Sequence, residues 1–410
     1  MTNKLLIIED NPAIAKIQKH IGIKLGFEVD IANSLAAAID LIEQNEYFCS
    51  VVDFVLPDAP YGEAIPFTIG ADISTIVMTG KLDNETREYV LRYPIVDYIT
   101  KESRQAFTYL ETQLARLPKN INVRILIVED SFATRKHLNS LLSRHKYKVS
   151  QASDGAQALK QLNSHSDIQV IITDNEMPIM DGITLTSKIR ETFNNDEKVI
   201  IGISSSKDNQ VSARFLKNGA NDYLRKPFFP EEFYCRLSQN IEMLDNIATI
   251  KQQANSDYLT KLPNRRYFFE QAEINSKINE ENKQICILAM IDIDHFKAVN
   301  DNLGHDIGDE VLKGFAKIFM RYFNDQLIAR LGGEEFSVYF TNTSFDKAKE
   351  QLETFRKVIE KCKINNVFFT VSIGLIYQDN YNIDQALKAA DEHLYTAKKF
   401  GRNILISDKY

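Results

Sequence analysis

The sequence has few cysteines and no long apolar run. Its four cysteines stand singly in mostly apolar surroundings, which predicts buried, reduced thiols rather than disulfides or a metal site; they are Cys49, Cys235, Cys286 and Cys362. No apolar stretch approaches the roughly 20 residues that span a membrane. The N-terminus enters an apolar, strand-like segment, residues 5–8, without a signal peptide. We therefore expect a cytoplasmic protein that has no membrane partner.

Runs of basic residues are also absent. Lysine and arginine number 49 against 56 aspartate and glutamate residues, which gives a net charge of −7. With neither a basic patch nor a helix-turn-helix segment, we expect no direct binding of nucleic acid. What the chain does have is length and apolar content. Its 410 residues, 44% of them hydrophobic, suit three domains with full cores.

The most informative segment is residues 330–336, with the sequence Arg-Leu-Gly-Gly-Glu-Glu-Phe. Short apolar stretches flank it, so Gly332 and Gly333 fall where a tight hairpin needs residues that tolerate positive φ. A glycine pair also lets a ligand approach the backbone closely. Glu334 and Glu335 project beside that approach, and carboxylate oxygens suit Mg²⁺ carrying a triphosphate. Taken alone, such a segment is usually only a hairpin with a solvated edge.

A second acidic group follows an apolar run, residues 285–293, that is typical of a central buried strand. Asp292 and Asp294 stand at its end, and either one alone is equally well explained as a cap of the next turn. If this strand neighbours the hairpin, Asp292 converges with the two glutamates. Converging carboxylates repel one another unless a cation lies between them. The two segments together predict a site for a nucleotide and a metal.

From about residue 255 to 406 these residues resemble the GGDEF family of diguanylate cyclases. The matching positions are residues 257–266, 292–294, 332–336, 371–374 and 390–391, with Tyr395, Lys398, Gly401, Arg402 and Asn403. Lys261 departs from the pattern, because the family commonly has glycine there. The resemblance implies a palm-like, nucleotidyl-cyclase-like α/β domain over residues 255–410.

The resemblance also implies condensation of two GTP molecules into cyclic di-GMP with release of pyrophosphate. The implied ligands of Mg²⁺ or Mn²⁺ are Asp292, the carbonyl of Ile293, Glu334 and Glu335. The implied nucleotide contacts are Asn300 and Asp309 to guanine, Lys297, Lys398 and Arg402 to the β- and γ-phosphates, and the backbone at Gly332 and Gly333. A 3′-hydroxyl that attacks an α-phosphate must lose its proton, and Glu334 is the candidate for helping to remove it. The alternative for each basic residue is a place on a solvated helix face.

One feature of many family members is missing. They carry an inhibitory Arg-x-x-Asp site whose arginine lies nine residues before the first hairpin glycine, and that register here holds Phe-Asn-Asp-Gln at residues 323–326. Arg321 and Asp325 are nearby but out of frame. We expect no strong product inhibition through this site.

The chain before this domain contains an internal repeat. Residues 5–10 recur as residues 125–130, an offset of 120 residues, and three further pairs of segments follow in the same order. Each is an apolar run that ends in a polar residue, which predicts parallel doubly wound sheets with ligands beyond the carboxyl ends of the strands. An acid pair, an aspartate, a hydroxyl and a lysine would converge there on Mg²⁺ and a phosphoryl group. Turn capping explains each residue singly, but not four repeated in order.

The two copies resemble receiver domains of two-component response regulators, at residues 1–118 and 122–243. The implied phosphoacceptors are Asp53 and Asp174, and the acid pairs that share the metal with them are Glu9 and Asp10, and Glu129 and Asp130. The implied switch residues are Thr79, Tyr98 and Lys101 in the first copy, and Ser204, Tyr223 and Lys226 in the second.

The second copy is closer to the receiver family. In the first, the hydroxyl follows the acceptor by 26 residues rather than 30, Glu102 replaces a proline, and residues 57–62 form an unusual loop. All the chemical groups survive, so we expect a sensor histidine kinase or a phosphotransfer protein to phosphorylate both aspartates. Asp174 is the stronger candidate.

Residues 230–256 connect the second copy to the cyclase-like domain. Apolar residues recur there at steps of three and four, at Phe233, Leu237, Ile241, Leu244 and Ala248. The first of them also suit simple cover for the receiver's own sheet. We predict that the last receiver helix continues as a linker able to form a two-stranded coiled coil.

Two functions fit this organisation. In the first, the domains that each hold one GTP meet in a homodimer, and phosphorylation shifts their pairing through the linker helix, so that the chain is a regulated diguanylate cyclase. In the second, the chain is a catalytically silent adaptor that binds GTP or a partner and relays or drains phosphoryl groups. Intact Asp292, Glu334 and Glu335 favour the first, because a domain that only binds has no need of metal ligands.

Overall fold

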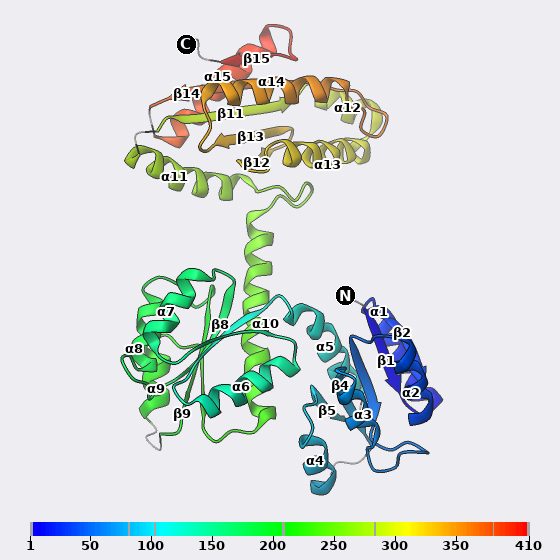
Figure 1. Cartoon of the computed structure of the whole chain (residues 1–410). Helices are drawn as coiled ribbons and strands as arrows, with labels where there is room; N and C mark the ends of the chain where they lie inside the picture. The colour runs from blue at the N-terminus through cyan, green and yellow to red at the C-terminus, as the bar shows by residue number, and fades with distance from the viewer. Residues whose placement is uncertain are drawn as a thin grey trace. The chain divides into compact units, whose positions relative to one another are not determined.

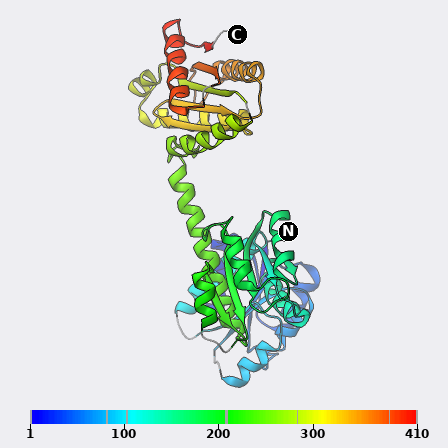
Figure 2. The same ribbon diagram turned by 90° about the vertical axis from the view of Figure 1, so that its left-hand side faces the viewer.

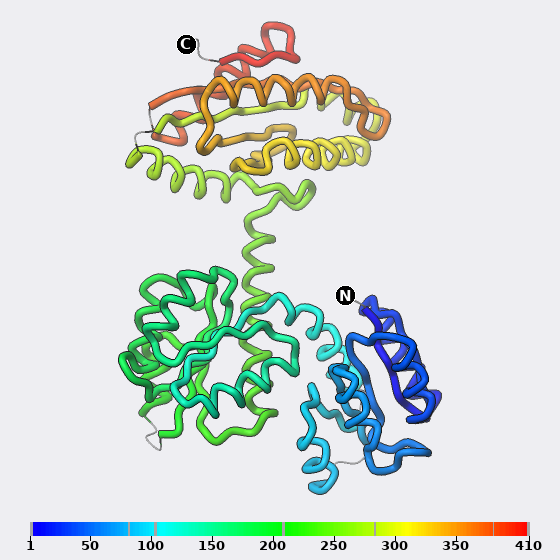
Figure 3. The backbone as a smooth tube through the Cα atoms, in the orientation of Figure 1, coloured from blue at the N-terminus to red at the C-terminus, as the bar shows by residue number. Residues whose placement is uncertain are grey.

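The structure is a computed structural model that describes residues 3–80, 83–101, 104–206, 210–282, 284–379 and 381–407. It divides into two compact units, Met1–Ile247 and Ala248–Tyr410. The first unit holds two five-stranded sheets and the second holds one. Figure 3 traces the first two sheets as successive stretches of the chain, blue to cyan and cyan to green. Among the described helices, none combines the length and apolar content needed to cross a bilayer.

The first sheet belongs to a domain that we call receiver 1, after the family that its sequence resembles. Its strands are β1 (Lys4–Ile8), β2 (Glu28–Ala32), β3 (Cys49–Asp53), β4 (Ser74–Thr79) and β5 (Asp97–Thr100), and its helices are α1 (Pro12–Lys24), α2 (Leu35–Gln44), α3 (Ala64–Gly70), α4 (Asn84–Leu91) and α5 (Arg104–Asn120). The strands are parallel in the order β2-β1-β3-β4-β5. Helices α1 and α5 cover one face and α2, α3 and α4 the other (Figure 1).

Receiver 2 repeats this plan. Its strands are β6 (Arg124–Val128), β7 (Lys148–Ala152), β8 (Ile168–Asp174), β9 (Val199–Ser204) and β10 (Asp222–Arg225), and its helices are α6 (Phe132–Arg144), α7 (Gly155–Ser164), α8 (Gly182–Arg190), α9 (Gln210–Lys217) and α10 (Pro230–Asn255). The sheet order β10-β9-β8-β6-β7 is that of receiver 1 read from the other edge. Both central strands, β3 and β8, are buried and end in the candidate phosphoacceptors.

Helix α10 is 26 residues long and runs without interruption (Figure 2). Phe233, Leu237 and Ile241 are buried against the sheet of receiver 2, as their spacing predicts. Residues 248–254 of the same helix are exposed. Cys235 is exposed as well, so the prediction that all cysteines are buried is wrong at this position, because it falls on the helix face that does not pack against the sheet.

The second unit contains a mixed sheet. Its strands are β11 (Cys286–Ile293), β12 (Leu327–Gly332), β13 (Glu335–Phe340), β14 (Val371–Gln378) and β15 (Leu405–Ser407), and its helices are α11 (Arg265–Glu281), α12 (Phe296–Leu303), α13 (His305–Tyr322), α14 (Phe345–Lys361) and α15 (Ile383–Lys399). The order is β12-β13-β11-β14-β15, and β11 is antiparallel to both of its neighbours.

The core of this unit positions β11 in the centre. The strand is buried along its whole length, with α13 and α14 packed on one face of the sheet and α11 and α15 on the other. Phe323 is fully buried in the first of these cores, so the position at which the resemblance led us to look for an inhibitory arginine holds a core side chain. The α/β architecture, with two parallel sheets and one mixed sheet, confirms the predicted fold class.

Candidate active site and phosphoacceptor sites

The end of β11 and the β12–β13 turn lie side by side in the second unit. Asp292 pairs with Glu335 of β13 and, on its other side, with Ser372 of β14. The amide of Ile293 donates a hydrogen bond of 3.3 Å to the carbonyl of Glu334. The strand pairing on which the predicted convergence depends is therefore present.

The turn itself uses both glycines. Gly332 has φ of 155° and Gly333 has φ of 50°, conformations that residues with a Cβ adopt rarely. A Cβ built on either glycine would meet no other atom within 4 Å. The backbone of the turn is thus open to the approach of a ligand, as the sequence predicts.

Asp292 is a buried carboxylate with one cationic partner. Its side chain is 6% exposed, and its Oδ2 lies 2.7 Å from Nζ of Lys398, near the end of α15. Burial raises the pKa of Asp292 to about 6; Glu334 and Glu335 raise it further, whereas Lys398 lowers it. The neighbourhood of this carboxylate therefore favours a bound cation.

Asp294 has a different role from Asp292. Its carboxylate accepts hydrogen bonds of 2.6 Å from the hydroxyls of Thr370 and Ser372 and one of 3.0 Å from the amide of Asn403. These partners come from the start of β14 and from the segment after α15. Asp294 thus ties three distant segments together, which is more than the turn cap considered for it.

The candidate guanine contacts lie on neighbouring helices. Asn300 is on α12 and Asp309 is in the first turns of α13. A Cβ on Gly308 would lie 1.9 Å from Oδ1 of Asn300, so the absence of a side chain at Gly308 lets Asn300 reach α13. Lys297 on α12 is exposed, and so is Arg402, just after α15.

The donor set at the end of β11 consists of oxygen atoms only, which fits a hard cation such as Mg²⁺ or Mn²⁺. The chemistry of these residues and the ammonium group held at Asp292 both agree with a cation site. The carboxylate oxygens of Asp292, Glu334 and Glu335 are not grouped within 4.8 Å of one another in the described structure. Their role as metal ligands stays a prediction.

Arg330 was not assigned a role from the sequence. Its Nε and Nη2 donate to the carbonyl of Gly333 at 2.9 and 2.7 Å, and its Nη1 donates to Oδ1 of Asp257 at 2.9 Å. Asp257 is the second residue after the end of α10, and its carboxylate also accepts hydrogen bonds from the amide and hydroxyl of Thr260. Burial opposes ionisation of Asp257, but the hydrogen bonds from Thr260 and Arg330 leave its pKa lowered. Arg330 therefore joins the end of the linker helix to the glycine turn.

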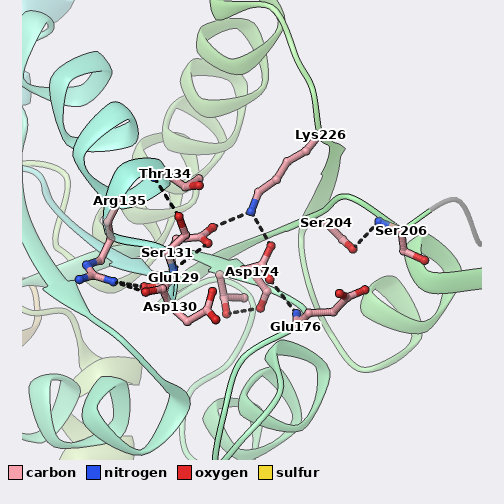
Figure 4. A network of polar contacts seen from close by, with 11 residues as sticks. Glu129, Asp130, Ser131, Thr134, Arg135, Asp174, Glu176, Ser204, Ser206 and Lys226 are labelled. Carbon is pink, nitrogen blue, oxygen red and sulfur yellow. Dashed lines mark hydrogen bonds and ion pairs between the residues drawn. The ribbon is translucent and has the colours of Figure 1, made fainter.

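Receiver 2 gathers its polar residues at the carboxyl end of its sheet (Figure 4). Nζ of Lys226 lies 2.6 Å from Oδ1 of Asp174 and 2.6 Å from Oε2 of Glu129. The amide of Glu176 donates to the second oxygen of Asp174 at 2.7 Å. Burial raises the pKa of Glu129, against the effect of Lys226, and for Lys226 burial is outweighed by the two carboxylates, so that its pKa is raised.

Receiver 1 has the same arrangement. Nζ of Lys101 lies 2.7 Å from Oε2 of Glu9 and 2.5 Å from Oδ2 of Asp53. Oxygens of Glu9, Asp10 and Asp53 all lie within 4.8 Å of one another. Burial raises the pKa of Glu9, Lys101 opposes it, and Asp53 adds to it. Three acids and a lysine therefore meet at the end of β3, as expected for a phosphoacceptor site.

Comparisons with known proteins agree with this geometry. The family model "Response regulator receiver domain" matches residues 5–108 and 125–238, and "Diguanylate cyclase, GGDEF domain" matches residues 254–404. The chain is a response regulator with a GGDEF domain. It is similar to a solved two-component system response regulator/GGDEF domain protein, with 36% identity, a TM-score of 0.55, and coverage of 59% of this chain and 99% of that one.

Two curated relatives of this response regulator are similar over part of their length. Response regulator PleD of Caulobacter vibrioides is 28% identical over 299 residues, which are 69% of this chain and 65% of that protein. Diguanylate cyclase DgcM of Escherichia coli is 37% identical over 201 residues, which are 47% of this chain and 49% of that protein. The chain thus spans less than two thirds of either relative.

The residues predicted to act as switches have different surroundings in the two receivers of this response regulator. Thr79 and Ser204 are buried at the ends of β4 and β9. The hydroxyl of Tyr98 accepts from Nε of Arg87 at 3.2 Å and donates to Oε1 of Glu231, in the first turn of α10, at 3.0 Å. Tyr223 instead packs against the ring of Phe215, with centroids 5.8 Å apart. Glu102, noted for replacing a proline, lies outside the described residues.

Proposed function

We propose that this response regulator is a phosphorylation-regulated diguanylate cyclase that condenses two GTP molecules into cyclic di-GMP and two pyrophosphates. The observation that carries the proposal is the pairing of the glycine turn with the end of β11. This pairing joins the carbonyl of Glu334 to the amide of Ile293, the residue after the buried Asp292, whose carboxylate is paired with Lys398. The match of residues 254–404 to the GGDEF family supports it.

In this proposal Asp292, the carbonyl of Ile293, Glu334 and Glu335 hold Mg²⁺ or Mn²⁺, which would lower the pKa of the attacking hydroxyl and offset phosphate charge. Glu334 takes the proton from the 3′-hydroxyl. That oxygen attacks the α-phosphorus of the other GTP, whose bond to the pyrophosphate oxygen breaks.

The remaining site residues orient the nucleotide and balance the charge of the leaving group. Asn300, whose side chain reaches α13 at Gly308, and Asp309 on α13 bind the guanine edge. Lys297, Lys398 and Arg402 carry the positive charge that the departing pyrophosphate requires. The open turn at Gly332 and Gly333 gives the phosphates access to backbone amides.

Each such site holds one GTP, so catalysis requires two chains in a homodimer. We propose that α10 controls this pairing. Receiver 1 contacts α10 at two places: Arg87 pairs with Glu231 at its start, and Arg116 pairs with Asp245 almost four turns later. Tyr98 also donates a hydrogen bond to Glu231. Phosphorylation at Asp53 that moves Tyr98 would therefore change the contact between receiver 1 and the start of α10. A sensor histidine kinase or a phosphotransfer protein is the proposed phosphoryl donor.

Arg330 gives the signal a physical route into the second unit. A rotation or shift at the end of α10 reaches Asp257, and Arg330 links Asp257 to the carbonyl of Gly333. The glycine turn is thus joined through Arg330 to Asp257, the second residue after the linker helix.

The deciding experiment measures cyclic di-GMP formed from GTP and Mg²⁺ by the purified full chain, with and without beryllofluoride as a mimic of phosphoaspartate. We expect beryllofluoride to increase turnover, and Glu334→Ala to lower it by about 100-fold or more. Glu350→Ala, which removes an exposed carboxylate from α14, is the matched control and should leave turnover unchanged. Absence of product in every condition, with GTP still bound, would instead support the silent adaptor.

A further inference from the structure

Lys398 is placed differently from the other cations of the candidate phosphate-binding group. Its Nζ lies 2.7 Å from Oδ2 of Asp292. Lys297 and Arg402 are exposed and take part in none of the ion pairs found among the described residues. Of the three cations, Lys398 is therefore paired with a candidate metal ligand, whereas the other two are exposed to solvent.

The pairing has a physical cause. Asp292 is 6% exposed and has Glu334 and Glu335 close to it, so an uncompensated charge at Asp292 would be costly. Lys398 supplies the compensating charge from the last turn of α15, and its side chain remains 32% exposed. Because the lysine side chain is flexible and one-third exposed, it can leave the carboxylate without disturbing the core.

We propose that Lys398 is the resident counter-ion of the cyclase metal site: it competes with free divalent metal for Asp292 and is displaced completely when a metal–GTP complex brings phosphates for its ammonium. The inference rests on the proposed function, because it needs that metal and that triphosphate. Free metal then binds weakly, since the site is open to it only in the fraction of molecules in which Lys398 has left Asp292. Metal and nucleotide consequently favour each other's binding.

The lysine and the acids of each receiver show that the chain uses this arrangement elsewhere. Lys101 and Lys226 each bridge two carboxylates of a candidate metal site. In the cyclase domain the bridge is reduced to one carboxylate, Asp292, which leaves Lys398 easier to displace.

The test is a titration of the nucleotide-free full chain with Mn²⁺ at about pH 8, where carboxylates are ionised. Electron paramagnetic resonance of the free ion measures how much Mn²⁺ stays unbound. The two receiver sites bind Mn²⁺ equally in every variant. Asp292→Asn removes the cyclase site, so subtracting the binding isotherm of this variant leaves the Mn²⁺ bound at the cyclase site alone. We expect Lys398→Gln to bind Mn²⁺ about tenfold more tightly than the wild type. Lys398→Arg, which retains the charge, should stay near the wild type.

Arg402→Gln is the matched control, because it removes a cation of the same group that does not touch Asp292. It should leave Mn²⁺ affinity unchanged while weakening the binding of guanosine α,β-methylene triphosphate, whose carbon bridge prevents the reaction. Unchanged or weaker Mn²⁺ binding in Lys398→Gln overturns the inference and leaves the proposed function standing. If wild type and Asp292→Asn bind Mn²⁺ identically even with the analogue, the metal site and the proposed function both fail.

Discussion

The two receivers share one fold but differ in how their acids are held. In receiver 1 the carboxylates of Glu9, Asp10 and Asp53 lie within 4.8 Å of one another, and no other group of three or more acids, cysteines or histidines in the described ranges meets that distance. In receiver 2, Arg135 donates to the backbone carbonyls of the acid pair, at 3.0 Å for Asp130. The residue at the matching position of receiver 1 is alanine.

Agreement with a family's sequence and assembly of its site are therefore separate properties. Receiver 2 is closer to the family motifs, yet the acids are gathered more tightly in receiver 1. The unusual loop of receiver 1 serves a local purpose, because Asp58 accepts the amides of Leu35 and Ala36 at 2.9 Å and caps α2. Its departures thus lie in connections and leave the acids in place.

Replacing the candidate acceptor aspartates, Asp53 and Asp174, should change the two receivers most. With acetyl phosphate and Mg²⁺, we expect two phosphoryl groups on the wild type, one on Asp53→Asn or Asp174→Asn, and none on the double variant. Mass spectrometry of intact protein and of peptides gives the count. Because its acids are already gathered, Asp53 should be labelled at the lower Mg²⁺ concentration. No adduct on Asp174 would show that receiver 2 is inert, and labelling of Asp174 first would show that its looser acids are no handicap.

A second difference lies at matched positions after α1 and α6, where receiver 1 has Leu25 and receiver 2 has His145. His145 is 3% exposed, and its ring lies 3.9 Å from that of Tyr234. Burial lowers the pKa of His145 to about 4, Arg144 adds to this, and a hydrogen bond with the backbone of Val96 opposes it.

This histidine predicts a dependence of stability on pH. Below its ordinary pKa of about 6.5 the unfolded chain binds a proton that the folded chain refuses until about pH 4. The unfolding free energy should therefore fall as pH decreases, by about 2 kcal/mol between pH 7 and pH 5 from this group. His145→Leu, which copies receiver 1, should remove that part of the slope in urea denaturation at the two pH values. Equal slopes for the two proteins would show that His145 titrates normally.

The elements built from local patterns were predictable from the sequence. Apolar runs that alternate with helical stretches predicted the two receiver sheets, the apolar run that contains Asp292 predicted the central strand β11, and the spacing from Phe233 onward predicted α10. Glycines at 332 and 333 required a turn with positive φ, which the structure has. In each case neighbouring residues alone determine the conformation.

Contacts between distant segments were not predictable in this way. Arg330 and Asp257 are 73 residues apart, and nothing in either local sequence tells that their side chains meet. Asp292 and Asp294 occupy equivalent places at a strand end, yet one binds Lys398 and the other binds Thr370, Ser372 and Asn403. Residues two apart along a strand point to the same face, so the local pattern does not distinguish these two, and only the packed fold decides what each carboxylate meets.

Removing the hydroxyl of Tyr98 or of Tyr223, the candidate switch tyrosines, should change stability only slightly and by different amounts. Tyr98→Phe removes the two hydrogen bonds that join Arg87, Tyr98 and Glu231, and should lower the unfolding free energy of the first unit by about 1 kcal/mol. Tyr223→Phe keeps the ring that packs against Phe215 and should change it by less than about 0.5 kcal/mol. Urea denaturation monitored by circular dichroism compares the two variants. A loss in Tyr223→Phe equal to that in Tyr98→Phe would mean that the hydroxyl bond to α10 does not distinguish the receivers, and the route from Asp53 to the linker helix would then have to run through Arg116 and Asp245.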